Sequence, residues 1–483
     1  MKRNIVLSLF VVLAFLLPAC APATPQIVEV EKQVVVEKPV IQTVEVEKVV
    51  EKEVVVTVEV EKVVEKEVVV TVEIEIPAIP PDAKLTAWFS QSYVEGMDDV
   101  HRSQVDEFTK FTGIPVEVSY INPEEFATKV NAALEAPETL PDLIQAEVFL
   151  FPLLQGAGRL VDVSDVASRL NEDEGGISPA LLSGVTVEGN QYAIPWMVDP
   201  MVTYLRTDVF EAAGLEMPDT YAELAEACPQ INVPGEMYCW GLNINDYADS
   251  EEATRGLIWA FGGAVTDAEG KEATINSPET IAAMEYLQNL ADVESFPPDF
   301  PTSDGYSNNL WYQTGLVAHT ANSGSIQAWL VENDPALAEN TVLTIPLAGE
   351  DGERPMSTNV FILGVTTNTK YPELAKKLLE WITSAGNGWA YIEAANYAFV
   401  SPYVGLVNRR VIQDDPNLRA LAETAAMSRY NSWPAPLSSA TSEMYGQAIV
   451  SKMALAVMMG EMTPEEAVAD AEAKVNEIIA RYQ

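Results

Sequence analysis

Downstream of Lys84 the chain alternates between strand-like and helix-like patterns of apolar residues. Residues 85–89 and 114–120 have the short apolar or alternating pattern of strands, whereas residues 98–111 and 123–134 place apolar side chains at helical spacing. Strands that alternate with helices predict parallel βαβ units. Ligands of such sheets bind beyond the carboxyl ends of the strands, so the loops that follow strands are the expected place for a site.

Residues 26–76 follow a different pattern and consist almost wholly of Val, Glu, Lys, Thr and Ile. The sequence TVEVEKVVEKEVVV of residues 43–56 recurs identically at residues 57–70, and a third copy begins at Thr71. Fourteen residues make two heptads, but the valines form no clean a/d stripe, and valine prefers strands. We therefore assign residues 21–83 to a soluble tether, with a self-associating β or coiled-coil element as the alternative.

The amino-terminal segment has the features of an export signal. Lys2 and Arg3 precede an apolar run over residues 5–17, which is too short to span a membrane, and Cys20 follows a short stretch of small residues. This arrangement resembles the lipobox of bacterial lipoproteins, in which the signal is cut before a cysteine that receives diacylglycerol. The resemblance implies that residues 1–20 are a lipoprotein signal peptide with a lipidated Cys20. The alternative is a plain secretory signal with an incidental cysteine.

Composition excludes several classes of function. The chain has 483 residues, too many for one small core, and its 72 acidic against 28 basic residues give a net charge of −44. Such a surface repels phosphate backbones, so no nucleic-acid partner is expected. His101 and His319 are the only histidines and have no metal-ligand spacing, so no metal or cofactor is expected. Cys228 and Cys239 close a short loop, and in an oxidising exterior this favours a disulfide over a metal or redox site.

Enzymatic activity has little support in the sequence. The chain lacks the G-x-S-x-G motif, and no glycine-rich phosphate-cradling motif is present. Paired carboxylates for glycoside hydrolysis stay open, because 72 acidic residues produce accidental pairs. We expect a binding protein and not an enzyme.

Several segments, in this order, resemble those of family 1 extracellular solute-binding proteins, the maltose-binding-protein-like group. They are FTKFTGIPV (residues 108–116), LPDLI (140–144), LQGAGRL (154–160), GNQYAIP (189–195), YLRTDVFEAAGL (204–215), TGLVA (314–318) and YPELAKKLL (371–379). The resemblance implies a two-lobed α/β fold of the periplasmic-binding-protein type with a solute cleft between the lobes. It also implies hinge closure around the solute and partnership with the permease subunits of an ABC importer.

The resemblance also implies where the chain crosses between lobes. Crossings are expected near residues 197–202, 356–361 and 414–416. Lobe 1 would then contain residues 84–198 and 357–414, and lobe 2 residues 203–355 and 416–483.

Candidate binding residues follow from the chemistry of sugars, which need hydrogen-bond partners for hydroxyls and aromatic rings for their apolar faces. Trp196 and Asp199 lead, because the resemblance aligns Asp199 with a sugar-binding carboxylate of the family; the alternative is a core tryptophan and a capping aspartate. Glu147 and Phe149 follow a predicted strand, on a loop that faces the cleft in the family. The other candidates lie near predicted loops or at positions that face the cleft in the family: Ser90, Ser92, Tyr93, Trp240, Asn243, Asn322, Ser323, Asn359, Trp433 and Tyr445.

Together these features predict a lipid-anchored, extracytoplasmic substrate-binding protein of an ABC transporter on the outer face of the cytoplasmic membrane. It is expected to capture a sugar or oligosaccharide and deliver it to the permease. A binding protein for a non-sugar solute and a surface structural or adhesive lipoprotein are the alternatives.

Overall fold

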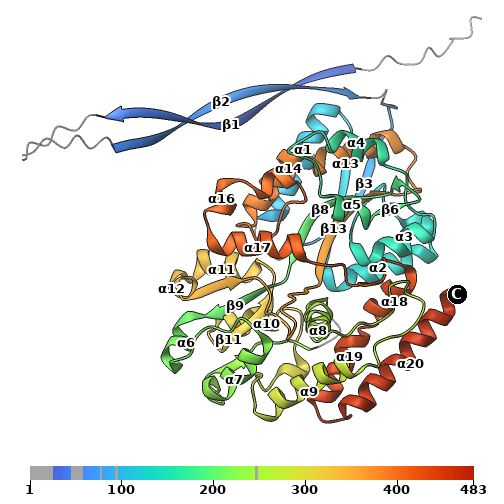
Figure 1. The fold of residues 1–483 in the computed structure, drawn as a ribbon. Coiled ribbons are helices and arrows are strands. Elements are labelled where there is room, and N and C mark those ends of the chain that lie inside the picture. Colours follow the sequence, from blue (N-terminus) through green and yellow to red (C-terminus); the bar gives the residue numbers. More distant parts are fainter. Residues whose placement is uncertain (1–25, 45–57, 77–78, 93–95, 245–247) are drawn as a thin grey trace, which may run out of the picture. The chain divides into compact units, whose positions relative to one another are not determined.

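The computed structural model describes five stretches of the chain: residues 26–44, 58–76, 79–92, 96–244 and 248–483. The chain divides into two compact units, Met1–Asp82 and Ala83–Gln483 (Figure 1). The division falls where the valine-rich repeat gives way to the strand and helix patterns. Within the described stretches, no helix has the length and apolar character needed to cross a membrane.

The first unit contains a long antiparallel hairpin of β1 (Gln26–Val44) and β2 (Val58–Ile76). The pairing sets Gln26 opposite Ile76 and Val44 opposite Val58. Valine is branched at Cβ and packs well on a pleated surface, which explains why the repeat forms strands and not a helical heptad array.

The first sheet of the second unit has the strand order β4-β3-β5-β13-β8. Its strands are β3 (Leu85–Ser90), β4 (Val116–Ile121), β5 (Leu143–Glu147), β8 (Ile194–Pro200) and β13 (Thr358–Val365). β3 pairs in parallel with β4 and β5, whereas β13 is antiparallel to β5 and β8. The βαβ pattern predicted for the start of this unit is confirmed.

A first set of helices accompanies this sheet, and α13 contacts β5, β8 and β13 directly. They are α1 (Met97–Thr112), α2 (Pro123–Glu135), α3 (Phe151–Gly156), α4 (Ser164–Leu170), α5 (Pro179–Ser183), α13 (Pro372–Thr383), α14 (Ala385–Ala394), α15 (Val404–Val407), α16 (Arg410–Gln413) and the 3-10 helices η1 (Pro137–Thr139) and η2 (Val148–Leu150). α1 ends at Gly113, which has a φ of 75° and donates its N–H to the carbonyl of Thr109. A glycine adopts this left-handed conformation without strain, so the predicted helix end is explained.

A small hairpin of β6 (Thr186–Val187) and β7 (Asn190–Gln191) precedes β8. Its two turn residues, Glu188 and Gly189, have φ values of 50° and 85°. Two successive positive φ values are what a tight two-residue hairpin turn requires.

The second sheet has the order β10-β11-β9-β12. Its strands are β9 (Val202–Arg206), β10 (Tyr238–Trp240), β11 (Val317–Asn322) and β12 (Thr341–Thr344). A disulfide joins Cys228 to Cys239 and fastens α7 to β10, the pairing that the sequence favours.

A second set of helices surrounds this sheet, with α19 packed between α20, α9 and α8. The set comprises α6 (Thr207–Ala213), α7 (Tyr221–Ile231), α8 (Ala248–Ala260), α9 (Pro278–Asp292), α10 (Ser307–Gln313), α11 (Ser325–Asn333), α12 (Pro335–Glu339), α18 (Ser439–Gly446), α19 (Ile449–Met458), α20 (Pro464–Tyr482) and the 3-10 helix η3 (Phe300–Thr302). α20 begins with a capping box in which the Thr463 hydroxyl accepts the N–H of Glu466 and the Glu466 carboxylate accepts the N–H of Thr463.

One connection between the two sheets is very short. Only Met201 lies between the end of β8 and the start of β9, so the chain passes directly from the first sheet to the second. α17 (Pro416–Met427) packs on β8 of the first sheet and on β9 and β12 of the second (Figure 1). This helix lies across the junction of the two sheets.

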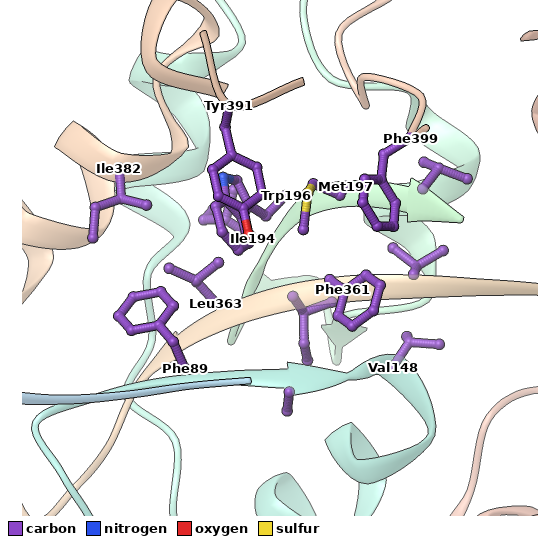
Figure 2. Close-up of a cluster of buried hydrophobic side chains, with 14 of the residues drawn as sticks. Phe89, Val148, Ile194, Trp196, Met197, Phe361, Leu363, Ile382, Tyr391 and Phe399 are labelled. Atoms are coloured by element: carbon purple, nitrogen blue, oxygen red, sulfur yellow. The ribbon is translucent and has the colours of Figure 1, made fainter. Parts of the chain in front are cut away.

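The core of the first sheet is rich in aromatic side chains. Figure 2 shows Trp196 and Tyr391 with their rings side by side, and their ring centroids are 4.7 Å apart. Phe89 of β3 also contacts Trp196, at a ring-centroid distance of 6.0 Å. These contacts fix the strand β8, whose next residues lead to the junction between the sheets.

Candidate functional site

A cavity of about 980 Å³ lies between the first sheet and the helices of the second. Strand ends of the first sheet contribute Glu147 and Asp199, and α8, α10, α11 and α18 contribute most of the facing wall. Its lining combines carboxylates, amides and aromatic rings. A cavity of this size with a few polar groups is typical of a small-molecule site.

The register of the first sheet brings three polar side chains together. β13 sets Asn359 opposite Asp199 and Phe361 opposite Glu147. The Asn359 Nδ2 donates to Glu147 Oε2 at 2.9 Å, which orients the Glu147 carboxylate. Asn359 thus supports the site through Glu147 and is not itself among the residues that line the cavity.

α8 supplies a second group of acidic side chains, which the sequence analysis missed. Asp249 and Glu251 line the cavity, and Glu252 lies behind Tyr445, whose hydroxyl donates to Glu252 Oε1 at 2.8 Å. Glu251 forms a buried ion pair with Arg255, at 2.7 Å between Oε2 and Nη2. Residues 249–255 have the sequence DSEEATR, and a charged run of this kind usually marks a solvated helix face. The one signal of an ion pair in the sequence is the spacing of four residues between Glu251 and Arg255, which places both on the same side of a helix.

Burial raises the pKa of several of these acids. The pKa of Glu147 rises to about 7, chiefly through burial, although the hydrogen bond from Asn359 opposes the rise. Burial raises the pKa of Glu252 to about 8, again against a hydrogen bond, here from Tyr445. The pKa of Asp199 lies well above its usual value because of burial and the nearby Asp249 charge. Near neutral pH the carboxyls can therefore act as hydrogen-bond donors or acceptors.

Two polar atoms at the cavity wall have no hydrogen-bond partner among the described residues. They are Asp199 Oδ1 and Ser442 Oγ. Both atoms are buried, and Ser442 as a whole is only 1% exposed. Buried polar atoms are nearly always satisfied, so the cavity offers an acceptor and a hydroxyl that a solute can engage.

Aromatic rings and a polar turn complete the wall. Phe149 and Tyr445 lie with ring centroids 4.9 Å apart, and Trp329 of α11 is 39% exposed. In the turn after β11, the Asn322 Oδ1 accepts the backbone N–H of Ser323 at 2.6 Å, and this turn lines the cavity as well. Flat rings beside polar atoms suit a ligand with apolar faces and hydroxyl groups.

Several sequence-predicted residues lie elsewhere. Trp196 is 2% exposed and packs in the core against Tyr391, and Trp240 is buried against Phe296 and His319. Their rings are needed to fill the cores of the two sheets, which is the alternative that the sequence left open for Trp196. Neither lines the cavity.

Other predicted residues have local partners or are not described. The Asn243 amide donates to the carbonyl of Asp304 at 3.1 Å. The backbone N–H groups of Ser90 and Ser92 donate to the side chains of Gln145 and Asp98, both at 3.1 Å. None of these three lines the cavity. Tyr93 and Cys20 lie outside the described residues.

Trp433 borders a second cavity, of about 510 Å³, on the other side of β8 and β13. The guanidinium of Arg429 lies 4.2 Å above the centre of its ring. Most of the remaining wall is formed by small and apolar residues, including Leu181, Val198 and Val400. We call this space the apolar cavity and the larger one the acidic cavity.

The acidic residues are not arranged as a metal centre. Across the described part of the chain, no cluster of three or more His, Cys, Asp or Glu side chains is placed to hold a metal ion. Burial lowers the pKa of His101 to about 3 and that of His319 to about 4, so both imidazoles are neutral near pH 7.

Residues 95–389 match the family model of the bacterial extracellular solute-binding protein. Because the match covers more than half of the chain, the chain belongs to this family. The predicted family and its two-lobed α/β fold are confirmed.

Relatives and solved structures agree with this assignment. The chain is 28% identical over 217 residues to the "Probable ABC transporter-binding protein" of Deinococcus radiodurans, which covers 43% of this chain and 50% of that protein. It is 22% identical over 410 residues to the diacetylchitobiose-binding protein DasA of Streptomyces coelicolor, across 83% of this chain and 90% of DasA. The fold is similar to that of an ABC transporter solute-binding protein from Thermotoga lettingae bound with α-D-tagatose: the TM-score is 0.71, the identity is 23%, and the match covers 82% of this chain and 100% of that one.

Proposed function

We propose that the Ala83–Gln483 unit is the substrate-binding protein of an ABC importer and captures a sugar or oligosaccharide in the acidic cavity. The observation that carries the proposal is the lining of this cavity, in which carboxylates, amides and aromatic rings surround about 980 Å³. Sugars present both hydroxyl groups and apolar ring faces, and this lining offers a partner for each.

Six of the sequence-predicted residues line the cavity and form the proposed contact set: Glu147, Phe149, Asp199, Asn322, Ser323 and Tyr445. The carboxylates and the Asn322–Ser323 turn would bind hydroxyl groups, and the rings of Phe149 and Tyr445 would cover an apolar face. The set draws on strand ends of the first sheet and on the turn and α18 beside the second, so a bound solute would touch both halves of the unit.

Capture by hinge closure follows from this two-sided contact. The single residue Met201 between β8 and β9 supports a crossing within residues 197–202. The lobe boundaries expected from the sequence, with residues 84–198 and 357–414 in one lobe and 203–355 and 416–483 in the other, remain part of the proposal. Closing the lobes around the solute would bring both walls of the cavity onto it.

The proposal includes a lipid anchor at Cys20, the repeat segment as a tether, and delivery of the solute to membrane permease subunits at the outer face of the cytoplasmic membrane. No catalytic role is proposed. Intact-mass analysis of the exported chain and of a Cys20→Ser variant tests the anchor, because only the first should carry acyl mass. Equal masses after correction for the substitution would contradict it.

A thermal-shift screen of the protein against mono- and oligosaccharides tests the central claim. A ligand at 100 times its dissociation constant adds about 2.7 kcal/mol to the free energy of unfolding, which is a readily measured shift. We expect at least one sugar to stabilise the chain and to bind with a stoichiometry of one in calorimetry. If no sugar in a broad panel does so, the sugar-binding proposal fails.

A further inference from the structure

The described wall of the acidic cavity is rich in carboxyl groups and contains no basic side chain. Among the described residues that line it, none is Lys or Arg, whereas six are acidic: Glu147, Asp199, Asp249, Glu251, Glu332 and Glu443. Two of the six are paired from behind, Glu251 with Arg255 at 2.7 Å and Glu443 with Arg481 at 2.8 Å.

Among the described residues, the hydrogen-bond partners of three cavity carboxylates are neutral groups. Glu147 receives a hydrogen bond from Asn359, Asp249 receives one from Asn308 at 3.1 Å, and Asp199 receives one from Ser323. Buried charges are normally paired, because removing an ion from water costs several kcal/mol. In the described part of the chain, no ion pair supplies these three acids with the positive partner that buried carboxylates usually have.

A second observation points to a bound ligand at the same place. Asp199 Oδ1 and the buried Ser442 Oγ line the cavity with no hydrogen-bond partner among the described residues. One lies on the strand side of the cavity and the other on α18. A ligand that donates to these atoms would satisfy them, whereas the described wall leaves both without a partner.

We propose that the solute of this cavity carries an ammonium group, as in an amino sugar, and that Glu147, Asp199 and Asp249 bind it. The inference rests on the proposed function, because it assumes that a small solute occupies this cavity. An ammonium group brings a positive charge and only donors, which fits the carboxylate oxygens of Glu147, Asp199 and Asp249. The aromatic and amide lining favours an aminated sugar over a plain alkyl polyamine, although the two share the ammonium chemistry.

Proton release would accompany this binding. The charged groups that act on the three acids are the acids themselves and Glu252, which accepts a hydrogen bond from Tyr445. Their neutral hydrogen-bond partners are Ser323, Asn308 and Asn359, and the Glu251–Arg255 ion pair lies on the same helix as Asp249. Because burial raises the pKa of Glu147 to about 7, this group is mostly protonated at pH 6 without ligand. An ammonium group favours the ionised carboxylate, so its affinity should rise as the pH increases from about 5.5 to about 7, where amines of ordinary pKa stay protonated.

Matched sugar pairs test the proposal on the full mature chain. Each pair differs only in an amine against a hydroxyl: glucosamine and glucose, galactosamine and galactose, and the β-1,4-linked glucosamine disaccharide and cellobiose. Spermidine serves as an ammonium without a sugar ring. Melting temperatures identify the binding members, and calorimetry at pH 5.5 and pH 7 measures their affinities.

We expect the amine member of at least one pair to bind about tenfold or more tightly than its hydroxyl partner, and more tightly at pH 7. If spermidine binds more tightly than the amino sugars, the ammonium site is supported and its ligand is an alkyl amine. Neutral sugars that bind with no amine preference would overturn this inference and leave the proposed function standing. If neither these probes nor the broad sugar panel bind, both proposals fail.

Amide variants locate the effect. Glu147→Gln and Asp249→Asn keep the side-chain shapes and remove the charges, and Glu211→Gln on an exposed position of α6 is the matched control. Both variants should lose about tenfold in affinity for the amine member and clearly less for the hydroxyl member, and Glu147→Gln should also remove the pH dependence of amine binding. An equal loss for both members, in variants whose melting temperatures are unchanged, would contradict an ammonium site.

Discussion

The two cavities beside strands β8 and β13 differ in chemistry although the same strands border both. Val198 lines the apolar cavity, and the next residue, Asp199, lines the acidic cavity. Thr358 borders the apolar cavity, while its neighbour Asn359 orients Glu147 in the acidic one. Successive side chains of a strand point to opposite faces of the sheet. The same pair of strands can therefore line the apolar cavity on one face and the acidic cavity on the other.

The difference shows where a ligand is needed. The apolar cavity has one cation, Arg429, and it already lies on the ring of Trp433. The acidic cavity has carboxylates without cations and buried polar atoms without partners among the described residues. Of the two cavities, the acidic one is therefore the better candidate for solute binding.

The largest expected effect is a pH dependence of stability that belongs to the acidic cavity. Between pH 4.5 and about pH 7 the folded chain keeps a proton on Glu147 that the unfolded chain has lost, so stability falls as the pH rises through this range. Above about pH 7, ionising the buried Glu147 lowers the free energy of unfolding by roughly 3 kcal/mol. Glu147→Gln should therefore stabilise the ligand-free protein at pH 8 by up to roughly this amount, and very little at pH 4.5.

Denaturant unfolding at both pH values measures the difference. Glu211→Gln, on an exposed position, should behave like the unchanged protein at each pH. A Glu147→Gln effect that is the same at pH 4.5 and pH 8 would show that the carboxyl is not perturbed.

The next effect concerns solute affinity and tests the two faces of β8 directly. Asp199→Ala removes a charged acceptor, and we expect sugar binding to weaken by roughly 10- to 150-fold, corresponding to about 1.5 to 3 kcal/mol. Val198→Ala, one residue away and facing the apolar cavity, should leave the affinity within about threefold. Calorimetry with a sugar from the screen decides; unchanged affinity in a folded Asp199→Ala protein would remove Asp199 from the site.

A smaller effect is expected at the apolar cavity. Trp433 packs against Trp259, with ring centroids 5.4 Å apart, and under the guanidinium of Arg429. Trp433→Ala should lower the free energy of unfolding by about 1 to 3 kcal/mol and change sugar affinity by less than about threefold. Trp433→Phe is the milder comparison and should recover part of the stability. A large loss of affinity with little loss of stability would make Trp433 a ligand contact.

The smallest effect is expected from the tether, which serves as the reference for both cavities. A chain that begins at Pro81 lacks the repeat but keeps the whole Ala83–Gln483 unit. Because residues 26–76 contain no aromatic side chain, we expect the same sugar affinity as in the full mature chain. Calorimetry on both proteins compares them, and a large loss on truncation would mean that the repeat takes part in binding.

The sequence was sufficient for local structure and for the family. The elements β3, α1, β4 and α2 form the predicted succession of strands and helices because each has its own period, and Gly113 ends α1 where expected. The sequence left the secondary structure of the repeat undecided between strands and a coiled coil, since a 14-residue period is compatible with both. Cross-strand pairing over residues that are distant in the sequence decided it.

The site was harder to predict because it depends on contacts between distant segments. The tryptophan of Trp196-Met197-Val198-Asp199 is directed to the core by Tyr391, which lies almost two hundred residues further along. Conversely, the acidic pattern of α8 is typical of a solvated helix face, whereas contacts with Asn308, Tyr445 and Ser451 of other helices bind these acids in the fold. Residue type and local period do not encode which neighbour will cover a side chain.

The excess of carboxylates in the acidic cavity also has a kinetic consequence. A chain of net charge −44 whose cavity wall lacks basic residues among those described sets up a negative potential at the point of capture. Salt screens such a field over about 8 to 10 Å at physiological ionic strength. The association rate of a positively charged solute should therefore fall as salt is added, that of an anion should rise, and that of a neutral sugar should stay constant. Stopped-flow measurements across a salt series would thus report the sign of the solute's charge.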